Sequence, residues 1–505
     1  YDALSERERL LFDRLSVFAG GFDVDDAEEV CGFAPLERPA VLEVLFALVD
    51  KSLVLADSRS ARTRYRMLET LRHYGGERLA DTGLEVDVRA RLLQWAVAVA
   101  ETAEPALEGR EQAVWLERLE LEHDNLRAAL TWALTTGAGV AGLRLAAALW
   151  RFWEVRGYLT EGRFWLERLL DLPGDVPSDL RAKALTSAGV LAQRQSAYEA
   201  AEAFYEASLV IRRESGDRRG TAAALLGLGN LAGLRGEHAR GRALFEESLS
   251  IGRSVGEPRV VAASLTNLGW LAHEQGDLAT ARTLLAESLE IQTTLRDGHG
   301  IANSLHRLGA LAQSEGDWAS ARSFYNEALG VQREVGERYG VVWSLSSLAD
   351  VHEAEGDLDA AGQLLTDVLA LSRELGNKYC ETITLTRLAK RAWRAGDRVL
   401  AEEFFGRGLA LAARLGDSRT AAECLEGLSG LAAADRPERA TTLLAAARSV
   451  THQGESHVAW PGREEDDDVV ALRAALGEAR FITAWMRGSA LSAEDAVRYA
   501  AEPNN

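Results

Sequence analysis

The chain has 505 residues, of which 47% are hydrophobic and 27% charged, so it is long enough to form three or four domains with buried cores. Its formal net charge of −20 disfavours general binding to nucleic-acid backbones or anionic membranes, and no apolar run approaches the ~20 residues of a membrane helix. Three well-separated cysteines exclude a disulfide scaffold and a thiolate zinc site, and they favour a reducing, cytoplasmic location.

The first 85 residues are predicted to form a small winged-helix domain. Ser5 and Glu8 have the spacing of a capping box ahead of an amphipathic helix. Two more helices follow, and then two short alternating segments flank a polar turn, as expected for a two-stranded wing. The predicted elements are a helix ending at Gly20-Gly21, helices over 23–31 and 39–50, strands over 53–55 and 64–67, and a helix from Glu69.

The third helix of this domain argues for a protein partner rather than DNA. A helix that reads the major groove offers Arg, Asn, Gln or Lys to base edges, whereas residues 39–50 are nearly all apolar and include Glu43 and Asp50. We therefore expect this helix to be buried in protein on more than one face. DNA binding remains the alternative, because the wing carries four arginines that could hold phosphates: Arg59, Arg62, Arg64 and Arg66.

Residues 86–175 are predicted to form irregular helices that link the winged helix to the rest of the chain. Their aromatic residues are expected to form a core between these helices, and a ligand pocket is the alternative. The cluster consists of Trp150, Phe152, Trp153, Phe164 and Trp165.

A 40-residue repeat dominates the middle of the chain. A glycine followed by an acidic residue recurs at this step from Gly236 to Gly396, and a second glycine turn keeps the same step from Gly216 to Gly416. Where the second series lacks its glycine, the sequence reads Arg296-Asp297-Gly298, so the glycine is displaced by two positions. Each unit is predicted to contain two helices that end at glycines in the left-handed conformation.

These repeats, expected over residues 176–425, resemble tetratricopeptide repeats. Leu225-x2-Leu228-Gly229-x2-Ala232 stands where that family has W-x2-L-G-x2-Y, and Ala321-x3-Tyr325 stands where it has A-x3-F. The period of 40 instead of 34 implies longer helices, and the closing proline of the family is missing. We predict an all-α fold: a tetratricopeptide-like right-handed superhelix of helical hairpins, preceded by the small winged-helix domain.

Residues 426–505 are expected to form a helical cap that closes the superhelix. His452 and His457 lie near an acidic run, 464–468, which we interpret as a solvated loop whose acids favour the amino end of the next helix. A loose metal site is the alternative, and no metal site is predicted elsewhere.

Tetratricopeptide geometry places the first helix of each unit along a concave groove. Three tryptophans with mixed charges on such a face favour a peptide or a small effector, and packing against the neighbouring repeat is the alternative. The predicted groove residues are Asn230, Trp270, His273, His306, Gln313, Trp343, Asp350, Glu353, Lys390 and Trp393.

Five segments together carry a wider family resemblance. They resemble the region after the ATPase domain in bacterial signal-transduction ATPases with numerous domains, which are relatives of the NB-ARC switches of plant resistance and apoptosome proteins. The resemblance covers essentially the whole chain. The segments are Leu4–Arg9, Leu15–Phe22, Leu48–Leu53, Arg64–Arg72 and Glu122–Leu130.

The resemblance implies that the winged helix packs on an upstream ATPase and helps to hold ADP in the off state, while the repeats receive the signal. Plant and apoptotic relatives have a Met-His-Asp motif whose histidine approaches the ADP phosphate. The corresponding nucleotide-contact candidates here are Met67, Leu68 and Glu69. Leu68 cannot hydrogen-bond a phosphate, and Glu69 is expected to cap the helix that follows.

We therefore expect a regulatory, non-enzymatic module of an ATPase switch that acts as a transcriptional regulator. None of the four lysines lies in a Gly-Lys-Ser/Thr phosphate loop, so ATP, ADP and Mg²⁺ are expected only with the absent ATPase domain. The chain begins at Tyr1 without an initiator Met, as expected of a piece of a longer protein.

The expected partners are the upstream ATPase and an effector protein, peptide or small molecule, without nucleic acid or membrane. The isolated chain is expected to be monomeric. A DNA-binding regulator that uses the winged helix and a passive assembly scaffold remain the alternatives.

Overall fold

The computed structural model describes residues 1–57, 63–107, 111–195, 197–451 and 467–501. These residues contain 26 helices and two short strands, so the prediction of an all-α fold is confirmed. The chain forms two compact units. Unit 1 contains residues 1–315 and 327–339, and unit 2 contains residues 316–326 and 340–505.

The amino-terminal part of unit 1 has the predicted winged-helix order. The predicted capping box is present, because the Ser5 hydroxyl accepts from the Glu8 amide at 3.3 Å and the Glu8 carboxylate accepts from the Ser5 amide at 2.7 Å. The first helix ends at Leu15 rather than at Gly20, because Ser16 turns back and donates to the Asp13 carbonyl. The elements are α1 (Glu6–Leu15), α2 (Val24–Cys31), α3 (Arg38–Asp50), β1 (Leu55–Asp57), β2 (Arg64–Arg66) and α4 (Glu69–Thr82).

Helix α3 buries one face only, so the expectation of burial on more than one face is wrong for this structure. Val41, Leu45 and Leu48 are fully buried in the core of the winged helix. On the outer face, Leu42 is 38% exposed and Phe46 is 49% exposed. The face on which a DNA-reading helix would carry polar side chains is therefore apolar and open.

The segment after the winged helix forms five helices whose core is continuous with that of the winged helix. Phe152 and Trp153 are buried as expected, but Phe164 is 48% exposed, so only part of the aromatic cluster is core. The helices are α5 (Glu85–Ala106), α6 (Gln112–Leu121), α7 (His123–Thr136), α8 (Gly139–Arg156) and α9 (Leu159–Leu170).

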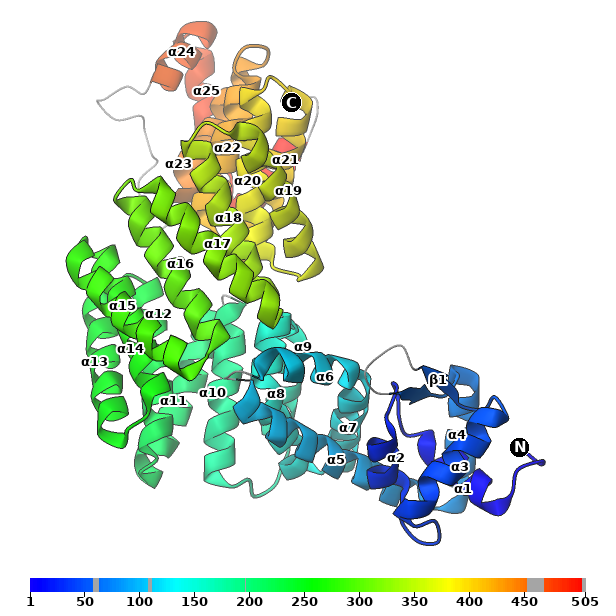
Figure 1. Cartoon of the computed structure of the whole chain (residues 1–505). Coiled ribbons are helices and arrows are strands. Elements are labelled where there is room, and N and C mark those ends of the chain that lie inside the picture. The colour runs from blue at the N-terminus through cyan, green and yellow to red at the C-terminus, as the bar shows by residue number, and fades with distance from the viewer. Residues whose placement is uncertain (58–62, 108–110, 196, 452–466, 502–505) are drawn as a thin grey trace. The chain divides into compact units, whose positions relative to one another are not determined.

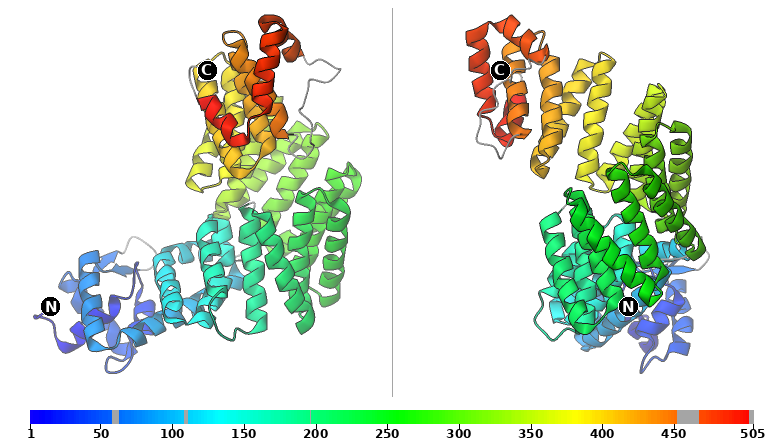
Figure 2. Two further views of the ribbon diagram at one scale, coloured as in Figure 1. Left: turned by 180° about the vertical axis from the view of Figure 1, so that it is seen from behind. Right: turned by 90° about the vertical axis from the view of Figure 1, so that its left-hand side faces the viewer.

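The repeats form helices of 15 to 18 residues in strict succession, from α10 to α23. In unit 1, α10 to α15 stack side by side in chain order (Figure 1), and the views in Figure 2 show the same order. The helices of unit 1 are α10 (Ser178–Arg194), α11 (Tyr198–Ser215), α12 (Arg218–Leu234), α13 (His238–Val255), α14 (Pro258–Glu274), α15 (Leu278–Leu295) and α16 (Gly298–Ser314). Helix α17 (Trp318–Val335) contributes to both units, and unit 2 continues with α18 (Arg338–Ala354), α19 (Leu358–Glu374), α20 (Lys378–Arg394), α21 (Arg398–Leu415), α22 (Ser418–Ala432) and α23 (Pro437–Thr451).

The turns between repeat helices confirm the role predicted for the glycines. The glycines of both series have φ between 67° and 83°. At the position without a glycine, Arg296 itself takes the left-handed conformation with φ of 53°, and Asp297 then caps α16 by accepting from the Gly300 amide at 3.1 Å. Arg296 thus keeps the turn geometry, although arginine favours the left-handed conformation less than glycine does.

Close packing within each hairpin depends on small and hydroxyl side chains. A Cβ added at Gly229 would lie 2.5 Å from the Phe245 ring, so α12 and α13 approach more closely than an alanine would allow. A buried serine also ties the second helix of the hairpin to the first at the same 40-residue step. Ser208, Ser248 and Ser288 donate to the carbonyls of Ala182, Ala222 and Ala262 at 2.8, 3.0 and 2.8 Å.

Three helices close the carboxyl end of unit 2. Residues 467–489 form two helices, because Gly477 with φ of 74° ends the first of them. Arg439 of α23 donates to the Ala500 carbonyl at 2.6 Å and so fixes the last helix. The helices are α24 (Asp467–Leu476), α25 (Glu478–Ser489) and α26 (Ala493–Ala501).

Candidate functional site: the first helices of the repeats

All ten predicted groove residues lie on the first helix of a hairpin. In unit 1, Asn230 lies on α12, Trp270 and His273 lie on α14, and His306 and Gln313 lie on α16. In unit 2, Trp343, Asp350 and Glu353 lie on α18, and Lys390 and Trp393 lie on α20. Trp343 is 43% exposed and Trp393 is 42% exposed, whereas the other eight residues are half-buried.

Trp270 in unit 1 packs against α12, the first helix of the preceding repeat, and remains partly accessible. Its ring covers Gly233 of α12, since a Cβ added at Gly233 would lie 2.4 Å from the ring. Its indole N–H donates to the Glu274 carboxylate at 3.2 Å. The guanidinium carbon of Arg307 lies over the ring, 5.0 Å from its centroid. Trp270 therefore packs between repeats, as the alternative interpretation predicts, and the rest of its ring is bordered by polar groups.

Charged side chains of α8 and α10 form a cluster in unit 1, and one of them, Arg194, is close enough to repel the charge of Arg307. Arg194 of α10 donates to the Glu154 carboxylate of α8 at 2.7 Å, and Arg151 donates to the same group at 3.1 Å. Burial of Glu154 opposes its ionisation, but the guanidinium groups of Arg194 and Arg151 outweigh it and lower the pKa of Glu154 to about 2. Glu154 is therefore ionised and already paired at neutral pH.

In unit 2, most predicted groove charges are paired within the chain. Arg387 of α20 contacts the Asp350 carboxylate at 2.5 Å and the Glu353 carboxylate at 3.3 Å. Burial raises the pKa of Asp350, although the Arg387 charge acts in the opposite direction. Lys390 contacts Glu423 of α22 at 2.7 Å. These charges hold neighbouring repeats together and leave the two tryptophans as the accessible groups.

The two tryptophans of unit 2 differ in the residues that pack against their rings. Trp393 packs on Gly430 of α22, where an added Cβ would lie 2.4 Å from its ring, and its ring meets Phe405 edge to face at 6.5 Å. Trp343, by contrast, has no such ring partner among the residues that the structure describes. Trp343 is therefore the groove tryptophan whose removal should disturb the fold least.

Two arginines of this face, Arg307 and Arg387, are not among the residues predicted from the sequence. Arg307 and Arg387 occupy the same position of the 40-residue repeat, two repeats apart, and both lie on a first helix. An alignment of the repeats would have shown this recurrence. Their partners could not be foreseen as readily, because Arg387 meets acids that precede it by 34 and 37 residues.

The three nucleotide-contact candidates lie where α4 begins. Met67 is half-buried, Leu68 is 47% exposed, and Glu69 is exposed. The expectation that Glu69 caps the helix is wrong, because the cap position is Leu68 and no side chain bonds to the free amides of the first turn. Instead, the Glu69 carboxylate accepts from Arg72 at 2.5 and 3.1 Å, which lowers the pKa of Glu69.

A buried polar junction, which was not predicted from the sequence, fixes the winged helix to α7 and the residue before it. Arg64 of β2 pairs with the Glu122 carboxylate and donates to the Gly21 carbonyl at 2.6 Å. Asn125 accepts from the Gly20 amide at 2.9 Å and donates to the Gly21 carbonyl at 2.8 Å. Arg64 is therefore committed to the protein and is not available for a DNA phosphate.

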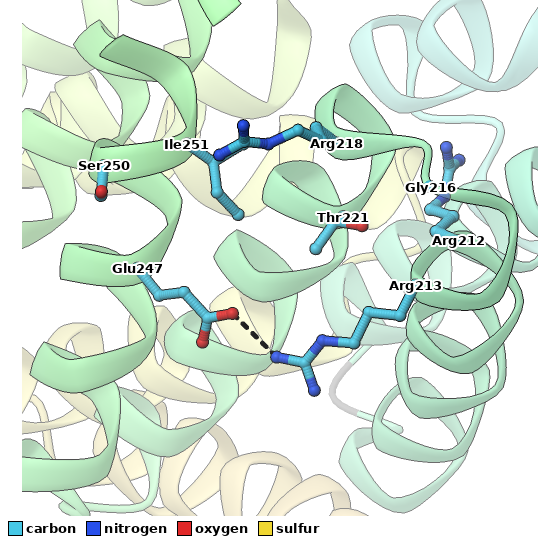
Figure 3. Close-up of a pocket in the computed structure, with 8 residues that line it drawn as sticks. All are labelled: Arg212, Arg213, Gly216, Arg218, Thr221, Glu247, Ser250 and Ile251. Atoms are coloured by element: carbon cyan, nitrogen blue, oxygen red, sulfur yellow. Dashed lines mark hydrogen bonds and ion pairs between the residues drawn. The ribbon is translucent and has the colours of Figure 1, made fainter. Parts of the chain in front are cut away.

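A pocket of about 410 Å³ lies between α11, α12 and α13 in unit 1 (Figure 3). Arg213 pairs with Glu247 at 2.8 Å across the pocket, as the dashed line in Figure 3 shows, and Arg212 pairs with Asp217 at 2.5 Å. The lining residues are Arg212, Arg213, Gly216, Arg218, Thr221, Glu247, Ser250 and Ile251. Three arginines outnumber the two acids that pair with Arg212 and Arg213, so the pocket is positive overall.

Other predicted features fall partly outside the structure. Arg59, Arg62 and the segment 452–466, which contains His452 and His457, lie outside the described residues. Among the residues that are described, no group of three or more His, Cys, Asp or Glu side chains could hold a metal ion. Within the same residues, no helix is long and apolar enough to cross a membrane.

Two family models match the chain. Residues 4–80 match the winged helix-turn-helix domain, and residues 221–294 and 300–374 match the tetratricopeptide repeat. The chain therefore contains a winged helix-turn-helix domain followed by tetratricopeptide repeats, in agreement with the structure.

Curated relatives match only a part of the chain. A Mycobacterium tuberculosis protein named as an HTH-type transcriptional regulator is 40% identical over 192 residues, which are 37% of this chain and 22% of that protein. An uncharacterized protein of the same species is 40% identical over 89 residues, which are 17% of this chain and 23% of that protein. The matched part is thus less than a quarter of the length of either relative.

Solved structures with similar helices include a Pyrococcus horikoshii signal-transduction ATPase with a tetratricopeptide repeat sensor. It has a TM-score of 0.49 and 14% identity, over 86% of this chain and 60% of that chain. A Rap protein complexed with competence and sporulation factor has a TM-score of 0.46 and 12% identity, over 64% of this chain and 99% of that chain. These values are too low to extend any property of either protein to this chain.

Proposed function

We propose that this chain is the regulatory and sensing part of a larger transcriptional switch protein. In this proposal the winged helix docks on another domain of the intact protein, and the first helices of the repeats bind an effector. The name of the mycobacterial relative supports a regulatory role, and the family resemblance of the five sequence segments supports an ATPase as the domain on which the winged helix docks.

The observation that carries the proposal is the outer face of α3. Leu42 and Phe46 are exposed there, and the neighbouring polar groups, Glu43 and Asp50, are acidic. The one basic side chain of α3 within the described residues is Arg38, at the start of the helix, and it is paired with Glu29. The rest of this face offers no donor to base edges and would bring negative charge to the phosphate backbone. An apolar, acid-rimmed helix face fits the surface of a protein domain.

The half-exposed tryptophans support effector binding. Aromatic rings that keep about half of their surface free on a rigid helix are typical anchors for a bound peptide. Trp343 and Trp393 meet this description, and the adjacent charges of Asp350, Glu353 and Lys390 are internally paired. A ligand of unit 2 would therefore be held mainly by apolar contact.

In this proposal the ATPase on which the winged helix docks, and not the chain itself, binds the nucleotide. We expect calorimetry of the isolated chain with ATP or ADP and Mg²⁺ to give no binding heat, because its four lysines lie outside any phosphate loop. Micromolar binding of either nucleotide to the chain alone would contradict this assignment. A gel shift of duplex DNA by the chain at moderate salt would favour the alternative, a DNA-binding regulator.

The regulatory role can be tested in the source organism even while the effector is unidentified. Chromosomal Trp343→Ala should reproduce the transcript changes caused by deleting the gene, provided that the protein accumulates at its normal level. The matched controls are Val210→Ala on α11 and Val399→Ala on α21, whose side chains are 56% and 82% exposed on second helices. These controls should leave transcript levels unchanged. A Trp343→Ala strain identical to wild type, beside a deletion strain that differs, would refute effector recognition at this residue. A deletion strain without any transcript change would refute the regulatory role itself.

A further inference from the structure

Arg307 of α16 is a cation without an acidic partner on a face where other arginines are paired. Within the described part of the chain, its guanidinium makes no hydrogen bond and no ion pair, and its one specific contact is with the Trp270 ring. Burial and the repelling charge of Arg194 lower the pKa of Arg307 to about 10, so it remains charged at neutral pH. An unpaired half-buried charge is costly to keep, and an incoming anion would offset that cost.

The chain contains its own comparison for this site. Arg387 has the same repeat position 80 residues later, and there Asp350 and Glu353 neutralise it at 2.5 and 3.3 Å. Eighty residues before these two acids, the sequence has Trp270 and His273. The same position in the repeat therefore gives a neutralised arginine in unit 2 and an unneutralised arginine on an aromatic platform in unit 1.

The acids near Arg307 are already engaged. Glu274 attracts Arg307 from beyond ion-pair distance, and its carboxylate accepts from the Trp270 indole at 3.2 Å. Glu154 is held by Arg194 and Arg151. Neither carboxylate forms an ion pair with Arg307, so within the described residues this guanidinium has the Trp270 ring as its specific contact.

We propose that Arg307, resting on Trp270, is the subsite that binds a carboxylate of a peptide effector, either its terminal carboxylate or an acidic side chain. A guanidinium above an aromatic ring, as Arg307 lies 5.0 Å from the centroid of Trp270, can still donate the two parallel hydrogen bonds that a planar carboxylate accepts. A single unpaired guanidinium matches the single charge of a carboxylate, whereas a phosphate dianion would bring a second charge without a partner. This assignment rests on the proposed function and adds the chemistry of the ligand to it.

The subsite is tested with a small probe instead of the unknown effector. N-acetylglycine carries the carboxylate of a peptide end, N-acetylglycinamide lacks the charge, and inorganic phosphate represents the other anion. The readout is the side-chain Nε–H signal of Arg307 in the full chain labelled with [¹⁵N]arginine, assigned by its loss in Arg307→Gln. The Arg387 signal, assigned in the same way, is the internal control.

We expect N-acetylglycine to shift the Arg307 signal saturably, with an affinity at least about tenfold above that of the amide or of phosphate, while the Arg387 signal stays in place. His273→Glu places an acid at the repeat position of Glu353 and should weaken this binding at least about tenfold. His273→Gln, which has the residue found at the same position as Gln313, should retain it. Circular dichroism and an unchanged Arg387 signal show that each variant is folded.

Equal shifts of the Arg307 and Arg387 signals with any salt would overturn the subsite, and preference for phosphate would overturn the choice of carboxylate. Retention of the full response in His273→Glu would overturn the comparison between repeats. Each of these results would leave the transcript experiment with Trp343→Ala unaffected, so the subsite and the proposed function can fail separately.

Discussion

Removal of Arg64 should detach the winged helix from the helices that follow it. The Glu122 side chain is 1% exposed and the Arg64 side chain is 17% exposed, so Arg64→Ala leaves a buried carboxylate without its cation and the Gly21 carbonyl without one donor. Breaking a buried pair from one side costs about 3–5 kcal/mol. Asn125 still donates to Glu122 at 2.8 Å, so we expect the lower end, about 3 kcal/mol, or roughly a hundredfold in the opening equilibrium.

Native-state hydrogen exchange measures this local opening directly, without requiring that the whole chain unfolds in one step. The reporters are the amides of Phe22 and Tyr65, which bond to each other's carbonyls at 2.9 and 2.8 Å. Arg66→Ala is the matched control, because Arg66 lies on the same strand and is exposed, and we expect it to change the opening free energy by less than about 0.5 kcal/mol. Adding Glu122→Gln to Arg64→Ala should recover at least about 1 kcal/mol, because the uncompensated charge is gone. Equal exchange in Arg64→Ala and Arg66→Ala would refute the junction.

Three further outcomes follow from particular residues. Arg296→Gly should stabilise unit 1 by about 0.5–1 kcal/mol in urea unfolding, since glycine takes φ of 53° without strain. A destabilised variant would contradict the turn geometry. Burial, together with the charge of Glu122, raises the pKa of Asp26 to about 7, so the folded state holds this proton more tightly than the unfolded chain does. The free energy of unfolding should therefore fall as the pH rises from about 5 to 7.5. Asp26→Asn should flatten that slope. Trp343→Ala should lower the melting temperature by no more than about 1–2 °C in calorimetry, because the ring is 43% exposed, and a large loss would show that the ring is core.

The repeat architecture could be predicted because its signals are local. Glycines that end each helix and apolar residues at helical spacing recur every 40 residues, so both the helix pairs and their turns can be found without reference to tertiary contacts. The groove residues could be placed on the first helices for the same reason. The winged helix was recognisable by the order of its elements, although the end of α1 depends on a hydrogen bond from Ser16 that apolar spacing does not reveal.

The contacts that give the candidate site its chemistry could not be predicted in the same way. Arg64 and Glu122 are 58 residues apart, and no periodic pattern connects them. The pairing of Arg387 and the isolation of Arg307 depend on which side chains the preceding repeats place opposite them. The exposure of Phe164 is a similar case, because an aromatic residue in a cluster can face either the core or the solvent.

The central claim is that the first helices of the repeats are the surface that receives an effector. The most direct measurement is selection of binders from a random peptide library on the isolated chain, followed by hydrogen exchange of the chain with each selected peptide. We predict that bound peptides slow exchange on first helices, either α12, α14 and α16 in unit 1 or α18 and α20 in unit 2. Peptides that protect unit 1 should lose binding in Arg307→Gln, and peptides that protect unit 2 should lose binding in Trp343→Ala. Peptides that slow exchange only on second helices such as α11 and α21, or a library that gives no binder, would contradict the claim.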